Sequence, residues 1–239
     1  MRTRIDEIAP NFYRIATYVP GYDLQFNQFL VVDDEVLLYH TGMRKLFPLV
    51  REAVAKIVEP TCIRWIGFSH FEADECGSLN EWLSQAPQAQ FISGTIGAIV
   101  NINDFALRKG RVLAADEVLT TGSYRFRLLE TPHVPHAWDA SLLLEETESV
   151  LFCSDLFLQK SNGAPLSEED LVSPARQALL DYEAGPLRQP LVYTGLTRDT
   201  LRTLAELRPK LLAIMHGSSF KGDGESALRD LSEMYAATL

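Results

Sequence analysis

The sequence predicts an α/β fold in which helices cover β-sheets. Two observations carry this prediction. Short apolar, β-branched and aromatic runs dominate the first two-thirds of the chain, whereas the last third mainly has the residue spacing of helices. Helical segments also lie between the strands, which is typical of layered mixed folds. This pattern does not by itself give the order of the strands in a sheet.

The expected strands are recognised by alternation or by short buried runs. They lie at residues 11–15, 28–32, 36–39, 61–68, 90–93, 124–129, 141–144, 150–153 and 211–215. Asp33 and Asp34 separate the second of these strands from the third, and the polar residues 145–149 separate 141–144 from 150–153. Each of these two pairs is therefore predicted to form a hairpin.

The expected helices show apolar residues at helical spacing. They lie at residues 43–57, 79–84, 95–100, 167–188, 197–208 and 224–237. In the first, Leu46, Val50 and Val54 recur every fourth residue, and Pro60 lies just beyond the end, where a helix cannot continue. The last of these helices is amphipathic.

Length and composition limit the class of protein. No repeat, low-complexity tract or long Gly/Ser linker divides the 239 residues, so we expect one domain, residues 1–239. A net charge of −10 argues against a nucleic-acid partner, which usually needs a basic face. No apolar run approaches the ~20 residues that span a bilayer. The N-terminus lacks the apolar core of a secretory signal, so we expect a cytoplasmic protein with no membrane partner.

The three cysteines do not form a recognisable framework. Cys62, Cys76 and Cys153 are scattered, and no CxxC pair occurs. An odd number of cysteines with this spacing argues against a set of disulfides or a zinc ribbon. Buried structural thiols are the simplest interpretation.

The stretch SHFEADECG, residues 69–77, holds an unusual density of charge. His70, Glu72 and Asp74 lie two residues apart, and Glu75 adds a third carboxylate. Residues two apart point the same way in an extended chain or a tight loop, whereas on a helix they diverge. Several carboxylates at one point repel each other unless a cation lies among them. A metal ion is therefore the simplest explanation of the motif.

Three further polar residues follow apolar strands. His136 comes after the strand at 124–129 and a short turn, Asp155 follows VLFCS, and His216 follows LLAIM. Strand ends are where α/β folds place their sites. Together with the first motif these residues give six ligands, enough for two metals that share a bridging carboxylate. Acidic surface loops also produce strings such as HxExD, but the three additional strand-end residues favour a metal site.

The spacing of this set resembles that of the metallo-β-lactamase superfamily, and within it the flavodiiron branch. That branch carries H-x-E-x-D-H followed by His, Asp and His at longer intervals. Here 19 residues separate His136 from Asp155, and 61 separate Asp155 from His216. The segments CGSLNEW, HAWD and LFCSDLF also resemble stretches of the family. The resemblance covers roughly residues 10–225.

The resemblance implies both a fold and a cofactor. The superfamily implies an αββα sandwich with the metals at one edge of the sheets. The branch implies two non-haem irons that bind, and often reduce, dioxygen or nitric oxide. Carried over by position, iron 1 would take His70, Glu72 and His136, and iron 2 would take Asp74 and His216. Asp155 would bridge the two irons, together with an oxo or hydroxo group.

Glu72 distinguishes iron from zinc within the superfamily. Zinc hydrolases of the superfamily have histidine at this position. Imidazole suits zinc, whereas a harder and more anionic ligand set suits iron. The chain is therefore expected to be a diiron oxidoreductase or O2-binding protein.

The sequence departs from the flavodiiron pattern at Glu75, where the family has histidine. Glu75 either binds iron 2, directly or through a water, or points away and leaves an open position. We expect the direct or water-bridged role. Four carboxylates around two irons should favour the ferric state and lower the reduction potential.

A second departure concerns the electron supply. Flavodiiron enzymes continue into a flavodoxin-like domain that binds FMN, and we expect neither that domain nor FMN in this chain. The resemblance is therefore to a stand-alone oxygen-binding diiron protein. Reduction would need an external donor, such as a rubredoxin- or flavodoxin-like protein. A homodimer is expected only by analogy with the family.

Other candidate residues have weaker signals. His133 is an alternative ligand to His136, but the following Asp139 and the 19-residue step to Asp155 favour His136. We expect His133 and His40 to contact the ligands or the pocket, and Trp138 and Tyr39 to wall a small-gas pocket. Plain structural roles are the competing interpretation for these residues.

Three functions are consistent with the sequence. The first is a diiron protein that binds O2 or NO for sensing, storage or reduction. The alternative is a zinc-dependent hydrolase of a thioester or lactone, similar to glyoxalase II, against which Glu72 argues. The third is an interaction module with a degraded site, of which Glu75 would be the sign.

Overall fold

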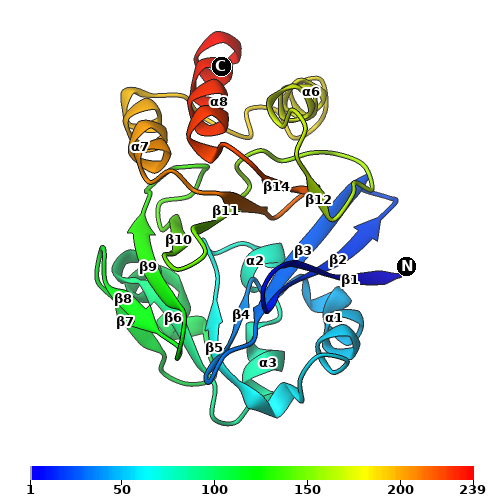
Figure 1. Ribbon diagram of the computed structural model, residues 1–239, viewed down its shortest axis with the longest axis vertical. Coiled ribbons are helices and arrows are strands. Elements are labelled where there is room, and N and C mark those ends of the chain that lie inside the picture. Colours follow the sequence, from blue (N-terminus) through cyan, green and yellow to red (C-terminus); the bar gives the residue numbers. More distant parts are fainter. Residues whose placement is uncertain (1) are drawn as a thin grey trace.

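The chain folds into two facing β-sheets (Figure 1). The computed structural model describes residues 2–239, and each sheet has seven strands. The first sheet runs in chain order: β1 (Thr3–Ala9), β2 (Phe12–Val19), β3 (Leu24–Val31), β4 (Val36–Tyr39), β5 (Ile63–Gly67), β6 (Gln90–Gly94) and β7 (Arg111–Leu113). The second has the order β12 (Leu166–Ser167), β14 (Ser219–Lys221), β13 (Leu211–Ile214), β11 (Val150–Ser154), β10 (Ser141–Glu145), β9 (Arg125–Glu130) and β8 (Val118–Thr120).

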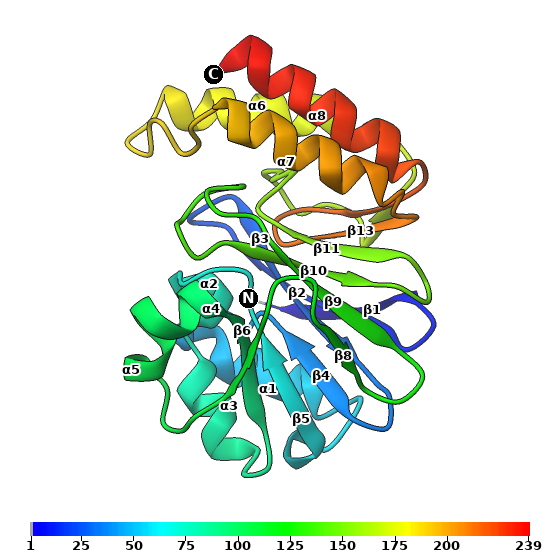
Figure 2. The ribbon, with the colours of Figure 1, turned by 90° about the vertical axis from the view of Figure 1, so that its left-hand side faces the viewer.

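Helices cover the outer face of each sheet (Figure 2). The first sheet is covered by α1 (Phe47–Val54), α3 (Leu79–Gln85) and the short α2 (Ala73–Cys76), α4 (Thr95–Gly97), η3 (Ala98–Ile102) and α5 (Asn103–Phe105). The second is covered by α6 (Val172–Glu183), α7 (Gly195–Glu206) and α8 (Gly224–Thr238). Two 3-10 turns, η1 (Arg44–Leu46) and η2 (Pro60–Cys62), complete the helical elements. This is an αββα sandwich, as the family resemblance implies.

The inner faces of the two sheets form one apolar layer. Phe152 on β11 lies within it, with its ring centroid 4.9 Å from that of Tyr39 and 5.5 Å from that of Phe29. All three side chains are buried, and burial of each such side chain contributes about 1.5–3 kcal/mol. Phe152 belongs to the second sheet and its two neighbours to the first. Their contact therefore fixes the strand ends of the two sheets relative to each other.

The strand ends deliver the candidate ligands, as predicted. β5 ends at Gly67, just before His70, and β13 ends at Ile214, just before His216. β11 ends at Ser154, directly before Asp155, and pairs in parallel with β13. Because parallel strands end at the same edge of a sheet, Asp155 and His216 lie together.

The structure also differs from the sequence predictions in places. The two predicted hairpins are present as the antiparallel pairs β3–β4 and β10–β11. The helix predicted at 167–188 is confined to α6, and the one predicted at 95–100 is interrupted by the π-turn η3. The strands β1, β7, β8, β12 and β14 were not predicted. No helix within residues 2–239 has the length and apolar character needed to cross a bilayer.

Candidate metal centre

The loop after β5 and the short helix α2 together present four candidate ligands, His70 and Glu72 from the loop and Asp74 and Glu75 from the helix. Glu72 is extended, with φ −138° and ψ 161°, and precedes α2, which is a single helical turn. The sequence motif was expected to stay extended through Asp74, but the helix already begins at Ala73. This turn brings Asp74 and Glu75 to the same side as His70, whose Nε2 lies 3.2 Å from Glu72 Oε2 and 3.9 Å from Glu75 Oε2.

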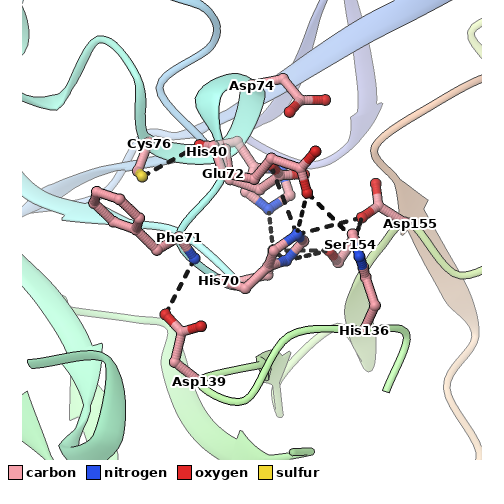
Figure 3. A network of polar contacts seen from close by, with 12 residues as sticks. His40, His70, Phe71, Glu72, Asp74, Cys76, His136, Asp139, Ser154 and Asp155 are labelled. Atoms are coloured by element: carbon pink, nitrogen blue, oxygen red, sulfur yellow. Dashed lines mark hydrogen bonds and ion pairs between the residues drawn. The ribbon is translucent and has the colours of Figure 1, made fainter. Parts of the chain in front are cut away.

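Asp155 connects the ligands that the other loops deliver. Its Oδ2 lies 3.0 Å from His136 Nε2 and 3.6 Å from His70 Nε2. Its Oδ1 lies 3.1 Å from His216 Nε2, which is also 3.2 Å from Asp74 Oδ2. Each carboxylate oxygen of Asp155 thus faces a different part of the site, which is the arrangement that a bridging carboxylate needs. Figure 3 shows His70, Glu72, His136 and Asp155 turned toward one another.

The seven side chains form three overlapping groups that could each hold a metal ion. In each group the candidate ligand atoms lie within 4.8 Å of one another. The groups are His70, Glu72 and His136; His70, Glu75 and Asp155; and Asp74, Glu75 and His216. The first group has the residues inferred for iron 1, and the last adds Glu75 to the two inferred for iron 2. The middle group, which contains Asp155, shares His70 with the first and Glu75 with the last.

Glu75 shows that the site suits a cation. Its side chain is 1% exposed, and neither carboxylate oxygen has a hydrogen-bond partner. Burial, followed by the charges of Asp155 and Asp74, raises the pKa of Glu75 well above its ordinary value. An unpartnered buried carboxylate is costly in a folded protein. A metal ion bound by Glu75 would remove that cost, so the residues present fit a metal centre.

The neighbouring carboxylates raise the pKa of two candidate ligand histidines, His136 and His216. Burial alone would lower the pKa of His216, but Asp155 and Asp74 raise it to about 10. A hydrogen bond with Asp155 raises the pKa of His136. Burial alone would raise the pKa of Asp155, but His136 and His216 hold it well below its ordinary value. In the absence of metal, a protonated His216 therefore balances part of the carboxylate charge, and metal binding must displace the proton on its Nε2.

Comparison with known proteins identifies the family. The sequence profile described as ODP family beta lactamase matches residues 24–217, which is most of the chain. The chain belongs to this ODP family. A rubredoxin-oxygen oxidoreductase of Megalodesulfovibrio gigas is 23% identical over 217 residues, covering 84% of this chain and 52% of the relative. A flavo-diiron protein of Clostridium acetobutylicum is 22% identical over 136 residues, covering 56% and 34%. The ODP-family chain thus matches about half, or less, of the length of these curated relatives.

Solved structures share the fold of this ODP-family chain. Rubredoxin oxygen:oxidoreductase from Desulfovibrio gigas superposes with a TM-score of 0.83 at 20% identity, covering 96% of this chain and 61% of that one. A fragment of a diflavin flavoprotein from Nostoc superposes with a TM-score of 0.77 at 14% identity, covering 99% and 98%. These likenesses confirm the predicted metallo-β-lactamase sandwich.

Two serines and a buried histidine orient His70 in the ODP-family site. Ser69 Oγ lies 3.0 Å from His70 Nδ1 and 2.7 Å from Ser154 Oγ. His40 Nε2 lies 3.2 Å from the same Ser69 oxygen. Burial lowers the pKa of His40 to about 3, so this imidazole is neutral. These contacts leave His70 Nε2 directed at the ligand cluster.

His216 is fixed in a similar way from the first sheet. Its Nδ1 lies 2.7 Å from the backbone oxygen of Gln25 on β3. Because a carbonyl only accepts, Nδ1 keeps its proton, and it is the proton on Nε2 that a metal would displace to bind the lone pair there. Sequence reasoning missed Ser69, Ser154 and Gln25. Ser69 and Ser154 are next to the candidate ligands His70 and Asp155 in the sequence, so a role in orienting them could have been predicted. Gln25 acts through its backbone oxygen, which every residue type has, so its identity gives no signal.

A pocket of about 610 Å³ opens onto the centre. Candidate ligands line its floor: Glu72, Asp74, His136, Asp155 and His216. Apolar side chains form much of its wall, among them Leu24, Phe26, Met43, Leu158 and Leu179. The pocket gives small molecules access to the ligand cluster, while apolar walls limit the water around it.

The predicted pocket roles of three residues are wrong. Tyr39 is 2% exposed and packs between the sheets beside Phe152, so it belongs to the core. Trp138 is 60% exposed, and His133 is also exposed. Both lie in the loop after β9, where positive φ angles at His133 (64°) and Ala137 (69°) turn the chain. None of the three lines the pocket.

The metal-free protein is expected to lose stability as pH rises from about 6.5 toward 10. In that range His216 is protonated in the folded state, where its pKa is about 10, but not in the unfolded state, where it is 6.5. The folded state then binds more protons, so raising the pH favours unfolding. The raised pKa of Glu75 acts in the same direction. Urea denaturation of chelator-treated protein over this range measures the effect, and His216→Gln should flatten it. A stability independent of pH would contradict the assignment.

Proposed function

We propose that this chain is a non-haem diiron protein that binds dioxygen or nitric oxide. The observation that carries the proposal is the ligand cluster. Three imidazoles and three carboxylates, from segments that follow different strands, gather around Asp155, and each of its oxygens faces a different imidazole. The names of the curated relatives, a rubredoxin-oxygen oxidoreductase and a flavo-diiron protein, support the same class of chemistry.

The composition of the cluster favours iron over zinc. Glu72 and His136 are neighbours at the first metal position, with Glu72 Oε2 3.5 Å from His136 Nε2. The second metal position has two carboxylates, Asp74 and Glu75, and one imidazole, that of His216. Oxygen-rich ligand sets suit iron, whereas zinc prefers imidazole and thiolate. The alternative of a zinc hydrolase has no comparable support from these residues.

The protein's own residues would hold, orient and shield the ligand-binding position. Ser69 and Gln25 set the ring orientations of His70 and His216. The apolar pocket wall suits an uncharged diatomic molecule, and Glu72, half exposed at the pocket floor, is the ligand best placed to yield to an incoming group. Two irons held in this way would supply one electron each to a bound diatomic ligand.

The biological setting follows from the same proposal. Electrons would come from a separate rubredoxin- or flavodoxin-like donor, and the name of one relative, rubredoxin-oxygen oxidoreductase, supports a donor of this kind. We further propose a cytoplasmic, single-domain protein that assembles as a homodimer. Sensing, storage and slow reduction of O2 all require this centre. They differ in how fast the donor can restore the reduced state.

The protein purified in air is expected to contain two irons per chain and to absorb in the near-UV and visible range. Metal analysis and an absorption spectrum measure both, followed by anaerobic reduction and exposure to O2 or NO. Absorption changes on exposure are expected for a site that binds these gases. A colourless protein with stoichiometric zinc and activity on a thioester or lactone panel would reverse the proposal. A metal-free protein after growth in iron-rich medium would indicate a degraded site.

A further inference from the structure

Arg14 is a buried cation with an unusual set of partners. It lies on β2, and its side chain is fully buried. Its Nη2 donates to Gln25 Oε1 at 2.9 Å and to the backbone oxygen of Gly217 at 2.8 Å. The nearest carboxylate, Asp6, is partly exposed and 3.5 Å away. Burial lowers the pKa of Arg14 to about 10, so the guanidinium is still charged at neutral pH.

The Gly217 oxygen accepts a second hydrogen bond from the same sheet. Asn27 on β3 donates from Nδ2 to this oxygen at 2.8 Å and to the backbone oxygen of Ile214 at 2.8 Å. The backbone N–H of Asn27 donates to Met215 at 3.0 Å. Together with Arg14, Asn27 therefore binds the segment on both sides of His216. All these donors come from the first sheet, while His216 follows a strand of the second.

The segment needs such support because its backbone is constrained. Gly217 has φ +106°, a conformation that side-chain-bearing residues rarely adopt. A Cβ at this position would lie 2.6 Å from Cβ of Gln159. The chain therefore turns sharply straight after a candidate ligand. The Gly217 carbonyl that Arg14 and Asn27 bind therefore belongs to the residue next to His216.

We propose that Arg14, together with Asn27, is a positioning residue that sets His216 at the second metal position. The inference rests on the proposed metal centre. A buried guanidinium is expensive, and an apolar side chain of similar volume would serve a purely structural role at lower cost. Arg14 also holds Gln25, whose backbone oxygen receives the Nδ1–H of His216. One side chain thus acts on the ligand through two routes.

Co²⁺ titration of the metal-free chain tests the inference, because the d–d bands of bound Co²⁺ report the ligand geometry. Arg14→Met is expected to weaken the second equivalent of Co²⁺ about 10–100-fold, as loss of a partner behind a ligand does, and to shift its bands. The first equivalent, bound by His70, Glu72 and His136, should keep its wild-type affinity. Arg14→Lys, which keeps a buried cationic donor, should recover part of the loss.

Arg108→Met is the matched control. Arg108 also donates to backbone carbonyls, those of Leu83, Ala86 and Ala89, but far from the metal ligands. Its variant should lose stability without changing either Co²⁺ affinity. If Arg14→Met does not fold, Asn27→Leu and Arg14→Lys provide the same comparison.

Two results would overturn the inference, and they can be distinguished. Wild-type affinities and bands in the Arg14 and Asn27 variants would reject the positioning role alone. A wild-type chain that takes up no Co²⁺ would reject the metal centre and this inference with it. If the Arg14 and Asn27 variants bind only the second equivalent of Co²⁺ more weakly, the result supports both the metal centre and the positioning role.

Discussion

An Asp155→Asn variant is expected to lose both metals while keeping its fold. Among residues 2–239, Asp155 is the carboxylate whose two oxygens face different imidazoles, with Oδ2 3.0 Å from His136 and Oδ1 3.1 Å from His216. The amide has nearly the same shape but no charge, and only one of its two terminal atoms can bind a cation. The amide oxygen can still bind at one metal position, but the other position loses its ligand and both lose the negative charge they share. We therefore expect an affinity loss greater than the roughly 10–100-fold seen for residues behind a ligand.

The measurement is metal content after dialysis, together with the circular dichroism spectrum and thermal unfolding. Asp33→Asn is the matched control, because Asp33 also accepts several hydrogen bonds, from Thr121 Oγ1 at 2.7 Å and from the Tyr124 N–H at 3.0 Å. It lies on the connection between β3 and β4 and contacts no candidate ligand. Asp33→Asn should lower stability and keep the metals. Full metal content in Asp155→Asn would show that Asp155 does not bridge.

Much of the metal centre was predictable because strand ends and spacing are local signals. The apolar strands before His70, Asp155 and His216 are visible in the sequence, and each strand end delivers its ligand to the cluster. The pairing of the sheets is not local. Strands of two or three residues, such as β12 and β14, are too short to show alternation, so they were missed.

The failures at the site have a common physical reason. Tyr39 and Trp138 are aromatic residues near strand ends, and nothing in residue type distinguishes a pocket wall from a core or a surface position. The structure decides it through the β4–β5 register for Tyr39 and through the loop after β9 for Trp138. Arg14 is the opposite case. Its charge suggests a surface residue, yet the ends of two sheets enclose it.

Glu75 is expected to show opposite effects with and without metal. In the metal-free protein its carboxylate is buried, unpartnered and surrounded by Asp155 and Asp74, which together with burial raise its pKa. Glu75→Gln removes this charge, and its amide can donate to the neighbouring carboxylates. We expect the metal-free variant to gain about 1–3 kcal/mol of stability, the range for relieving an unsatisfied buried polar group. The same change should weaken metal binding at the second position, because a ligand is lost there.

Glu145→Gln is the control that separates this effect from burial alone. Glu145 is also fully buried, but its carboxylate accepts hydrogen bonds from the backbone N–H groups of Thr147 and Glu148, each at 2.7 Å. Its variant should lose stability in both metal-free and metal-loaded protein. Urea denaturation of both variants, each with and without metal, measures the four free energies of unfolding that this comparison needs. If Glu75→Gln instead lowers stability with and without metal, as Glu145→Gln should, the Glu75 carboxylate does not bind a metal.

Glu75→His then tests how the second metal uses this position. A neutral imidazole in place of a carboxylate removes one negative charge from the ligand set, so the ferrous state is favoured and the reduction potential of the centre should rise. Anaerobic redox titration measures the potential, and Glu75→Gln shows how much of the change comes from charge alone. If the histidine variant binds two irons at the higher potential, Glu75 occupies a ligand position. A potential equal to that of the wild type would place Glu75 outside the coordination of the metal and leave its burial without a function.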